Sequence, residues 1–277
     1  MEALRYVTAT NATSVTIAAR PGLNVRVLEM WADSVPDKTY MDISIGPRTV
    51  ARVPLKWGDC LFIAPYSGSM RDESIFALIR DIFGSDVYVE ADQSEDIVFR
   101  FNNAVGRVHV LYQIHSETVR KELPLRSLQA RIPLFHILTH SAAVNATKNY
   151  SLDTALAPTG FPTFKDGDTI PAGCRFTLKA LAFGSASAGS TKPTAVHVWK
   201  REFEILTPET HAGITVDPAS NFLVLDVKTK DVFTTPEYAF GPGEKLTANF
   251  DATYDGTNAI AANTLALFLI GWFERVT

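Results

Sequence analysis

The chain has 277 residues, of which 46% are hydrophobic and 20% are charged, and its formal net charge is −4 at pH 7. This composition allows a substantial buried core and excludes a disordered chain. The mild negative charge and the lack of any Lys/Arg cluster argue against general binding of DNA or RNA, so we expect no specific nucleic-acid partner.

Short strand-like runs fill the first half of the chain. They are rich in β-branched and aromatic residues and are separated by Gly, Pro, Asp or Asn turns. The expected strands are Val15–Ala18, Val25–Met30, Tyr40–Ile45, Val50–Leu55, Leu61–Ile63, Val87–Glu90, Ile97–Phe101 and Val108–Ile114. We also expect a short turn at Gly106, between the last two of these strands. So many short strands are typical of a sandwich or a barrel.

One segment, Ser74–Phe83, breaks this strand rhythm. Its apolar residues recur at the spacing of a helix that buries one face, and they are Ile75, Leu78, Ile79 and Ile82. Asp72 or Ser69 can cap the start of this helix, and Gly84 can end it. We therefore expect one inserted helix in a late connection of the first half.

The segment Ser116–Arg126 is charged, contains a proline and interrupts the strand rhythm. Such segments are typical of domain boundaries. We place a linker at residues 119–131, between a first domain at residues 1–118 and a second domain at residues 132–277.

The second half repeats the strand rhythm with longer loops rich in Gly, Ser, Thr, Ala and Pro. A turn glycine opens an alternating strand in each half, at Gly22 and at Gly173, and each half closes on an apolar strand. The expected strands are Ile132–Thr139, Phe176–Phe183, Ala195–Trp199, Phe203–Leu206, Phe222–Val227, Leu246–Phe250 and Leu265–Trp272. The two halves share one plan, which predicts two consecutive β domains.

No sequence motif of a common enzyme is present. Ser67-Gly68-Ser69 lacks the Gly-x-Ser-x-Gly elbow of serine hydrolases, and no glycine-rich phosphate loop follows a strand. The two cysteines, Cys60 and Cys174, lie in strand-like settings, which favours small buried hydrophobic residues over a disulfide. We expect no enzyme activity, no catalytic residue and no cofactor.

Two pairs of residues are candidates for a metal site. Asp251 and Asp255 place oxygen ligands before a glycine as a calcium loop does, but no bidentate Glu follows, and Asp-Gly is also a common hairpin signal. His136 and His140 lie four residues apart, without a His-Glu-x-x-His motif or a nearby Cys pair. The patterns favour a turn at Asp255 and a structural role for the histidines.

The closing segment of the chain resembles the last strands of viral jelly rolls. A Gly-Pro-Gly-Glu turn at residues 241–244 leads into Lys245–Phe250, and the hydrophobic strand Leu265–Trp272 follows. Two such units in tandem, with a helix in a late loop of the first, resemble the double jelly-roll major capsid proteins of icosahedral, membrane-containing bacteriophages, the lineage that includes the adenovirus hexon. The resemblance implies an all-β fold of two tandem jelly-roll β-barrels with one inserted helix in the first.

The resemblance also implies a function. Capsid proteins of this family build an icosahedral shell from trimeric, pseudo-hexameric capsomers. The expected partners are therefore further copies of the chain in a homotrimer, neighbouring capsomers, other capsid proteins and an internal viral membrane. The protein would be made in the host cytoplasm and reside in the virion. Because the helix and the linker are the amphipathic elements outside the barrels, we expect contacts between barrels or subunits at Ile75, Ile79, Arg120, Lys121 and Arg126.

Two alternatives stay open. A receptor-binding or fibre protein can also be built from jelly rolls and recognises host-surface glycans through loop aromatics. A jelly-roll lyase or esterase would need a polar, charged concave face, whereas the strands here alternate mostly with Thr, Ser, Asn and Ala. The aromatic candidates for a glycan surface are the four tryptophans, most of which we expect in the core: Trp31, Trp57, Trp199 and Trp272.

Overall fold

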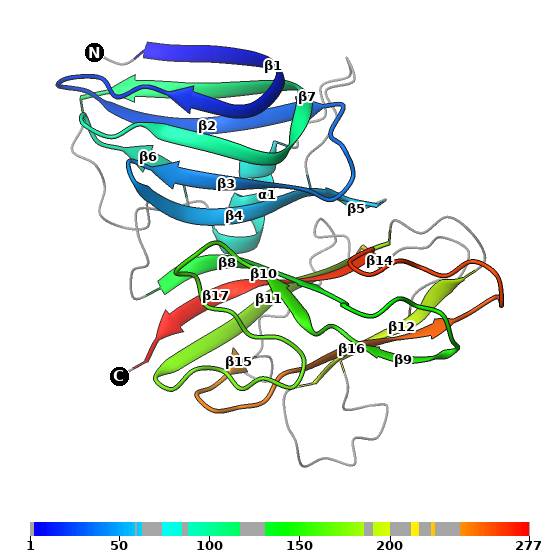
Figure 1. The fold of residues 1–277 in the computed structure, drawn as a ribbon. Coiled ribbons are helices and arrows are strands. Elements are labelled where there is room, and N and C mark those ends of the chain that lie inside the picture. The colour runs from blue at the N-terminus through cyan, green and yellow to red at the C-terminus, as the bar shows by residue number, and fades with distance from the viewer. Residues whose placement is uncertain are drawn as a thin grey trace. The chain divides into compact units, whose positions relative to one another are not determined.

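The chain folds into two compact units. A computed structural model describes residues 3–58, 60–62, 74–84, 88–116, 131–185, 191–199, 212–215, 223–224 and 239–276. One unit consists of Met1–Lys56 with Leu61–Ile132, and the other of Trp57–Cys60 with Pro133–Thr277. Strands dominate both units, and the described residues contain one helix (Figure 1). The expectation of an all-β fold with one helix in the first half is confirmed.

The first sheet has seven antiparallel strands. They are β1 (Ala3–Ile17), β2 (Asn24–Asp33), β3 (Thr39–Ile45), β4 (Arg48–Trp57), β5 (Cys60–Leu61), β6 (Val89–Ala91) and β7 (Ile97–His115). The strand order is β5-β4-β3-β7-β2-β6, and β1 pairs with β7 outside this path.

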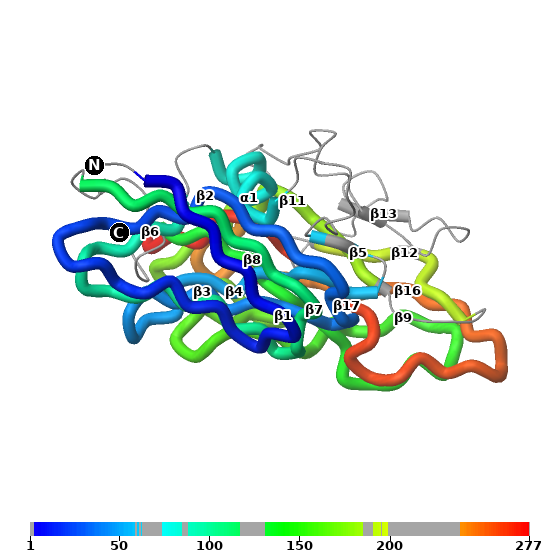
Figure 2. Tube along the Cα trace, turned by 90° about the horizontal axis from the view of Figure 1, so that it is seen from above, coloured from blue at the N-terminus to red at the C-terminus, as the bar shows by residue number. Residues whose placement is uncertain are grey.

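Strand β7 is the central strand of this sheet and pairs along both of its edges. Its first edge pairs with β1 from end to end, so that the two run side by side (Figure 2). Its second edge is shared, because residues 97–101 pair with β3 and residues 107–115 pair with β2. The 19 residues of β7 therefore hold three other strands in register.

The predicted turn at Gly106 is wrong, because β7 continues through this position. Val105 still pairs with Ala12 of β1, and the Gly106 N–H donates a hydrogen bond to the Ser34 carbonyl at 3.2 Å. A Cβ atom on residue 106 would lie 2.5 Å from the Ser34 Cβ. The glycine is thus required by the close approach of another backbone segment, and it does not reverse the chain.

Helix α1 (Ile75–Phe83) was predicted correctly, but its cap was not. The Ser74 hydroxyl accepts a hydrogen bond from the Ala77 N–H at 3.1 Å, so Ser74 is the N-cap in place of Asp72 or Ser69. Gly84 ends the helix with a φ of 107°. The buried face includes Phe76, which packs edge-on against Phe99 of β7 at 6.1 Å between ring centroids.

Polar contacts fasten α1 to β2 just beyond the end of β6, which pairs with residues 25–27 of β2. Arg80 donates to the Leu28 carbonyl at 2.9 Å, and both Arg80 and Ser74 bond to the Glu29 carboxylate. A bulge in β2 between Val27 and Glu29 places these acceptors there. The helix therefore shields backbone that β6 leaves open.

The second unit contains two antiparallel sheets. Their strands are β8 (Arg131–Thr139), β9 (Lys148–Ser151), β10 (Thr154–Leu156), β11 (Cys174–Ser185), β12 (Lys192–Trp199), β13 (Ala212–Thr215), β14 (Leu223–Val224), β15 (Ala239–Phe240), β16 (Thr247–Thr253) and β17 (Leu265–Arg275). One sheet has the order β10-β8-β17-β11-β14, with β15 also on β11, and the other has the order β13-β12-β16-β9. The predicted strand Phe203–Leu206 and most of Phe222–Val227 lie outside the described residues.

The core of the second unit is aromatic. Phe250 of β16 stacks on Tyr150 of β9 at 5.5 Å between ring centroids and packs against Phe183 of β11 at 6.1 Å. Residues 265–273 of β17 are all buried, which matches a central strand covered on both faces. At Gly271 a Cβ atom would lie 2.1 Å from the Thr177 carbonyl oxygen, so β17 and β11 approach closely where β11 bulges.

A buried ion pair lies in the first unit. The Glu90 side chain of β6 is fully buried, and one of its oxygens accepts hydrogen bonds from the Arg26 Nε at 3.2 Å and Nη2 at 3.0 Å. The His115 Nε2 lies 2.7 Å from the same oxygen. A carboxylate at this depth depends on these partners to offset its lost hydration.

Replacing Arg26 by Met removes the cation and leaves the buried Glu90 carboxylate with His115 alone. We expect Arg26→Met to lower the free energy of unfolding by about 3 kcal/mol, measured by urea denaturation. The matched control is Arg48→Met, which breaks the more exposed Arg48–Glu95 pair and should cost less than about 1 kcal/mol. Equal losses in the two variants would contradict the assigned role of Glu90.

Candidate functional site

The buried Cys60 thiol is not set up as a nucleophile. Burial raises the pKa of the Cys60 thiol to about 12, so almost no thiolate exists at neutral pH. Cys174 is half-buried at the start of β11, and both thiols are free. Within the described ranges, no three His, Cys, Asp or Glu side chains gather closely enough to hold a metal ion, and no helix is long and apolar enough to cross a membrane.

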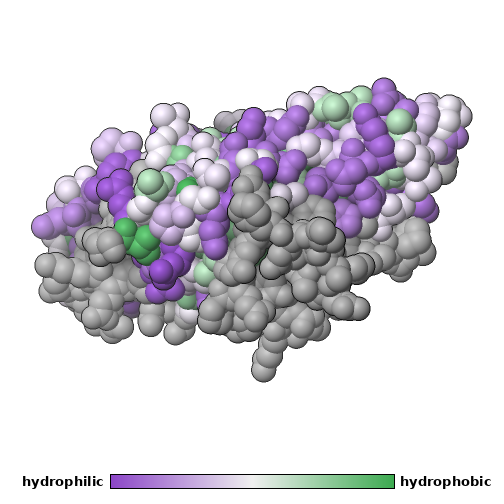
Figure 3. Space-filling view, turned by 90° about the horizontal axis from the view of Figure 1, so that it is seen from below, coloured by the Kyte–Doolittle hydropathy of each residue, from purple (hydrophilic) through white to green (hydrophobic). Residues whose placement is uncertain are grey.

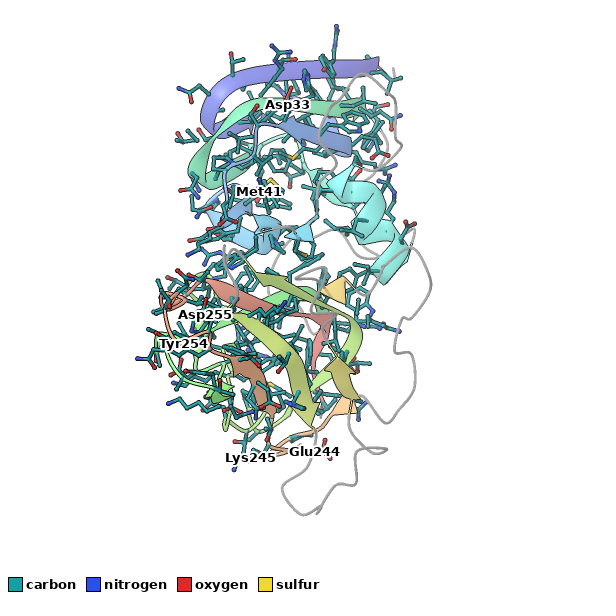
Figure 4. The ribbon with its side chains drawn as sticks, turned by 90° about the vertical axis from the view of Figure 1, so that its right-hand side faces the viewer. Asp33, Met41, Glu244, Lys245, Tyr254 and Asp255 are labelled. Atoms are coloured by element: carbon teal, nitrogen blue, oxygen red, sulfur yellow. The ribbon has the colours of Figure 1, made fainter. Side chains whose placement is uncertain are left out.

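The two calcium candidates are engaged in different structures. Asp255 forms a turn, because one carboxylate oxygen accepts hydrogen bonds from the N–H groups of Thr257 at 2.8 Å and Asn258 at 2.7 Å. Figure 4 shows Asp255 beside Tyr254, well away from Glu244 and Lys245 in the same unit. Asp251 lies on β16 and belongs to a separate polar cluster. The contacts of Asp255 agree with the turn that the sequence favours.

That polar cluster lies on the outer face of the four-stranded sheet. The Asp251 carboxylate accepts hydrogen bonds from His197 of β12 at 3.0 Å and from Asn149 of β9 at 3.1 Å, and Asn149 also donates to Asn249 at 2.8 Å. Burial alone would raise the pKa of Asp251, but these hydrogen bonds outweigh it and hold the pKa below its usual value. His197 belongs to no sequence motif, although the pattern Val196-His197-Val198 places it on the polar face of its strand.

The candidate zinc histidines are committed to backbone groups. His136 is fully buried, stacks on Phe164 at 4.1 Å between ring centroids and donates to the Phe164 carbonyl. His140 donates from Nδ1 to the Ala142 carbonyl at 2.6 Å and accepts at Nε2 from the Leu265 N–H at 3.1 Å. These contacts support the structural role that the sequence favours.

The expected interface residues fall into two groups. Ile75 and Ile79 are 0% and 1% exposed, so their side chains belong to the buried face of α1. The linker residues Arg120, Lys121 and Arg126 lie outside the described residues. The assignment of all five to an interface stays a prediction.

Two of the four tryptophans are core residues, as expected. Trp57 is 2% exposed and donates from Nε1 to the Thr264 carbonyl at 2.9 Å, and Trp272 is 4% exposed. Trp31 is half-buried on β2, and the side chain of Trp199 lies outside the described residues. Trp31 is therefore the one tryptophan among the described side chains that can reach a partner.

Trp31 belongs to an outer face formed by β1, β7 and β2. In this face Thr8, His109 and Trp31 are directly opposite one another, as are Thr10, Arg107 and Asp33. Asp33 lies at the end of β2, opposite Arg107 of β7 (Figure 4). We call these residues, together with Leu4, Tyr6 and Leu111 in the same alternation, the β1–β7–β2 face.

Tyr6 and His109 are the centre of the β1–β7–β2 face. The Tyr6 ring stacks on the His109 ring at 5.6 Å between centroids, and its hydroxyl bonds to Nδ1 of His109. Burial lowers the pKa of His109 below its usual value, the charge of Arg107 adds to this effect, and Asp33 partly offsets it. A lone histidine between valines gave no sequence signal, because its neighbours come from strands far apart in the chain.

The described surface is mostly hydrophilic where it is viewed in Figure 3, with small and scattered apolar spots. Leu4 and Tyr6, at 66% and 55% exposure, are the large hydrophobic side chains most exposed in the described part of the chain. Comparison with known protein families and with curated proteins finds no match to this chain. Inference about function must therefore rest on the fold and on these surfaces.

The turn at Asp255 predicts a response that separates it from a calcium site. We expect Asp255→Ala to lower the free energy of unfolding by about 1 kcal/mol, because two N–H groups lose their acceptor. We expect Asp255→Asn to retain most of this stability, because the amide oxygen can still accept. Thermal melts with millimolar calcium or with a chelator should coincide. A calcium-dependent rise in Tm that disappears in Asp255→Asn would contradict the turn.

The burial of His136 predicts a pH dependence of stability. Its pKa falls from 6.5 to about 4 on folding, so the unfolded chain binds the proton more readily and stability is lost as the pH falls from about 6.5 to 4. The loss amounts to about 3 kcal/mol from this residue. His136→Gln keeps a donor for the Phe164 carbonyl and should flatten this part of the profile of urea midpoint against pH. An unchanged slope in His136→Gln would refute the account.

Proposed function

We propose that this chain is a virion structural protein that builds a capsid shell, and that its second unit is a jelly roll. The observation that carries the proposal is the strand order of the second unit. One sheet contains β8-β17-β11-β14 and the other contains β9-β16-β12-β13. A jelly roll has eight strands that form two Greek keys, and this strand order in two four-stranded sheets is the one expected for it.

The path of the chain supports this reading. From β8 the chain crosses to the other sheet at β9, returns for β10 and β11, crosses again for β12 and β13, and returns for β14 and β15. It then crosses once more for β16 and ends with β17, back in the sheet that contains β8. Sheets made from strands so far apart in sequence do not arise from simple meanders of consecutive hairpins.

The strands of the first unit form one seven-stranded sheet, in contrast to the two sheets of the second unit. Here the last strand, β7, pairs with β3 through its first part and with β2 through its last part. Strands β1 and β7 curve together (Figure 4), and α1 packs its apolar face on the core. We propose that this curved sheet is the counterpart of the second unit, with β1 added along its closing strand.

A structural role agrees with how the polar groups are used. Three of the four residues that were candidates for a metal site, His136, His140 and Asp255, bond to backbone groups of their own unit. The framework then leaves its flanks and loops for contacts with other chains, as a closed shell requires. We propose the homotrimer as the capsomer, with neighbouring capsomers, other capsid proteins and an internal viral membrane as further partners, and the virion as its location.

A second candidate function is favoured by one observation. The β1–β7–β2 face combines aromatic rings, from Tyr6 and Trp31, with the polar side chains of Asp33 and Arg107. Aromatic faces bordered by polar groups are suited to binding sugars, as a receptor-binding or fibre protein does. Binding on a glycan array that Trp31→Ala abolishes and Tyr254→Ala preserves would establish this function.

The capsid proposal is tested by the mass and appearance of the purified chain. Light scattering should give a mass of three times 30.4 kDa, and negative-stain images should show a hexagonal outline or shell-like assemblies at high concentration. A monomer that never assembles, under any salt or concentration tried, would reject the proposal.

A further inference from the structure

We propose that two copies of this chain associate by antiparallel pairing of their β1 strands, through the segment Ala3–Thr10. The inference rests on the proposed function, since it names one surface through which copies of a structural protein meet. It concerns the free edge of β1 and the side chains that border it.

β1 is the long open edge of the first sheet. One edge pairs with β7, and among the described residues no strand pairs with the other. The outward N–H and C=O groups of such an edge are a template for another strand. The other sheet ends are short, since β5, β6, β9, β10, β13 and β14 have two to four residues each, whereas β1 has 15.

The sequence of Ala3–Thr10 lacks the usual protection of an edge. It holds one charge, at Arg5, and no proline, and its register with β7 is regular up to the irregularity between Ala12 and Ser14. Natural edges are normally blunted by lysines, prolines, bulges or shortness. An unprotected edge of this length is suited to a specific partner strand.

Two large hydrophobic side chains beside this edge are exposed to solvent. Leu4 and Tyr6 are 66% and 55% exposed, and both belong to the β1–β7–β2 face. Leu111 of β7 lies directly opposite Tyr6 and is half-buried. A strand added beside β1 would extend the sheet and remove apolar area of Leu4 and Tyr6 from water.

A second copy of β1 is the occupant that the sequence of the strand fits. A two-fold axis through Val7, perpendicular to the sheet, places Tyr6 opposite Thr8 of the second copy and Leu4 opposite its Thr10. Arg5 then faces Ala9 of the second copy, so the single cation of the segment does not meet its own kind. The outer faces of both copies lie on the same side, which gives one continuous sheet and a two-fold contact between neighbouring capsomers.

Sedimentation equilibrium of the full-length protein tests the proposal. The double variant Leu4→Lys, Tyr6→Lys places four cations about the pairing axis, and we expect its self-association to weaken at least tenfold. The control Ala261→Lys adds a cation at an exposed turn of the second unit and should associate as the wild type does. Circular dichroism must show that each variant is folded. A double variant that is folded and associates as tightly as the wild type would overturn the proposal.

Hydrogen exchange of the wild-type protein gives a second readout that needs no variant. Backbone amides in residues 3–10 should gain protection as the protein concentration rises, while those in residues 254–258 should not. If the wild type assembles without this gain, the β1 contact is wrong and the capsid function stands. If the wild type stays monomeric at every concentration, both are wrong.

Discussion

Each unit depends on one late strand that is paired along both of its edges. In the first unit β7 holds β1 on one side and β2 and β3 on the other, and in the second unit β17 lies between β8 and β11. The hydrogen-bonding demand of such a strand is met by segments far apart in the chain. The sheet that contains β7 and the sheet that contains β17 are therefore incomplete until the late strand is in place. Their formation requires the closure of long loops, which slows folding.

The buried polar groups serve this framework. The buried Glu90 is held by Arg26 and His115, and the half-buried Glu29 joins α1 to β2. His136 and His140 bond to backbone groups of the second unit. Buried groups of this kind cost hydration, so they stabilise the fold only while each keeps its partner, and they specify which segments meet. Polar groups that bond within their own unit are what a scaffold requires. The β1–β7–β2 face and the Asp251 cluster are suited to contact with other molecules.

Periodicity predicted the elements with strong local patterns. The helical spacing of Ile75 and Ile79 predicted α1, alternation predicted β2 and β11, and a continuous apolar run predicted β17. Other features depend on contacts between distant segments. Glycine is common in turns, but Gly106 lies within a continuous strand, where the close approach of Ser34 leaves no room for a side chain. Most of β1 was missed because residues 3–11 include no buried side chain and carry apolar side chains on both faces of the strand, so they show no apolar alternation. The clusters around His109 and His197 could not be predicted from local patterns, because the pairing of strands that are distant in the chain brings their members together.

We propose that this chain is the repeating unit of a shell and that its second unit is a jelly roll. The decisive measurement is cryo-electron microscopy of the assembled 277-residue chain. We expect copies arranged about a three-fold axis, in which β8-β17-β11-β14 and β9-β16-β12-β13 form the two sheets of the second unit. An ordered assembly whose second unit joins its strands in another order, or a protein that yields only single copies, would contradict it.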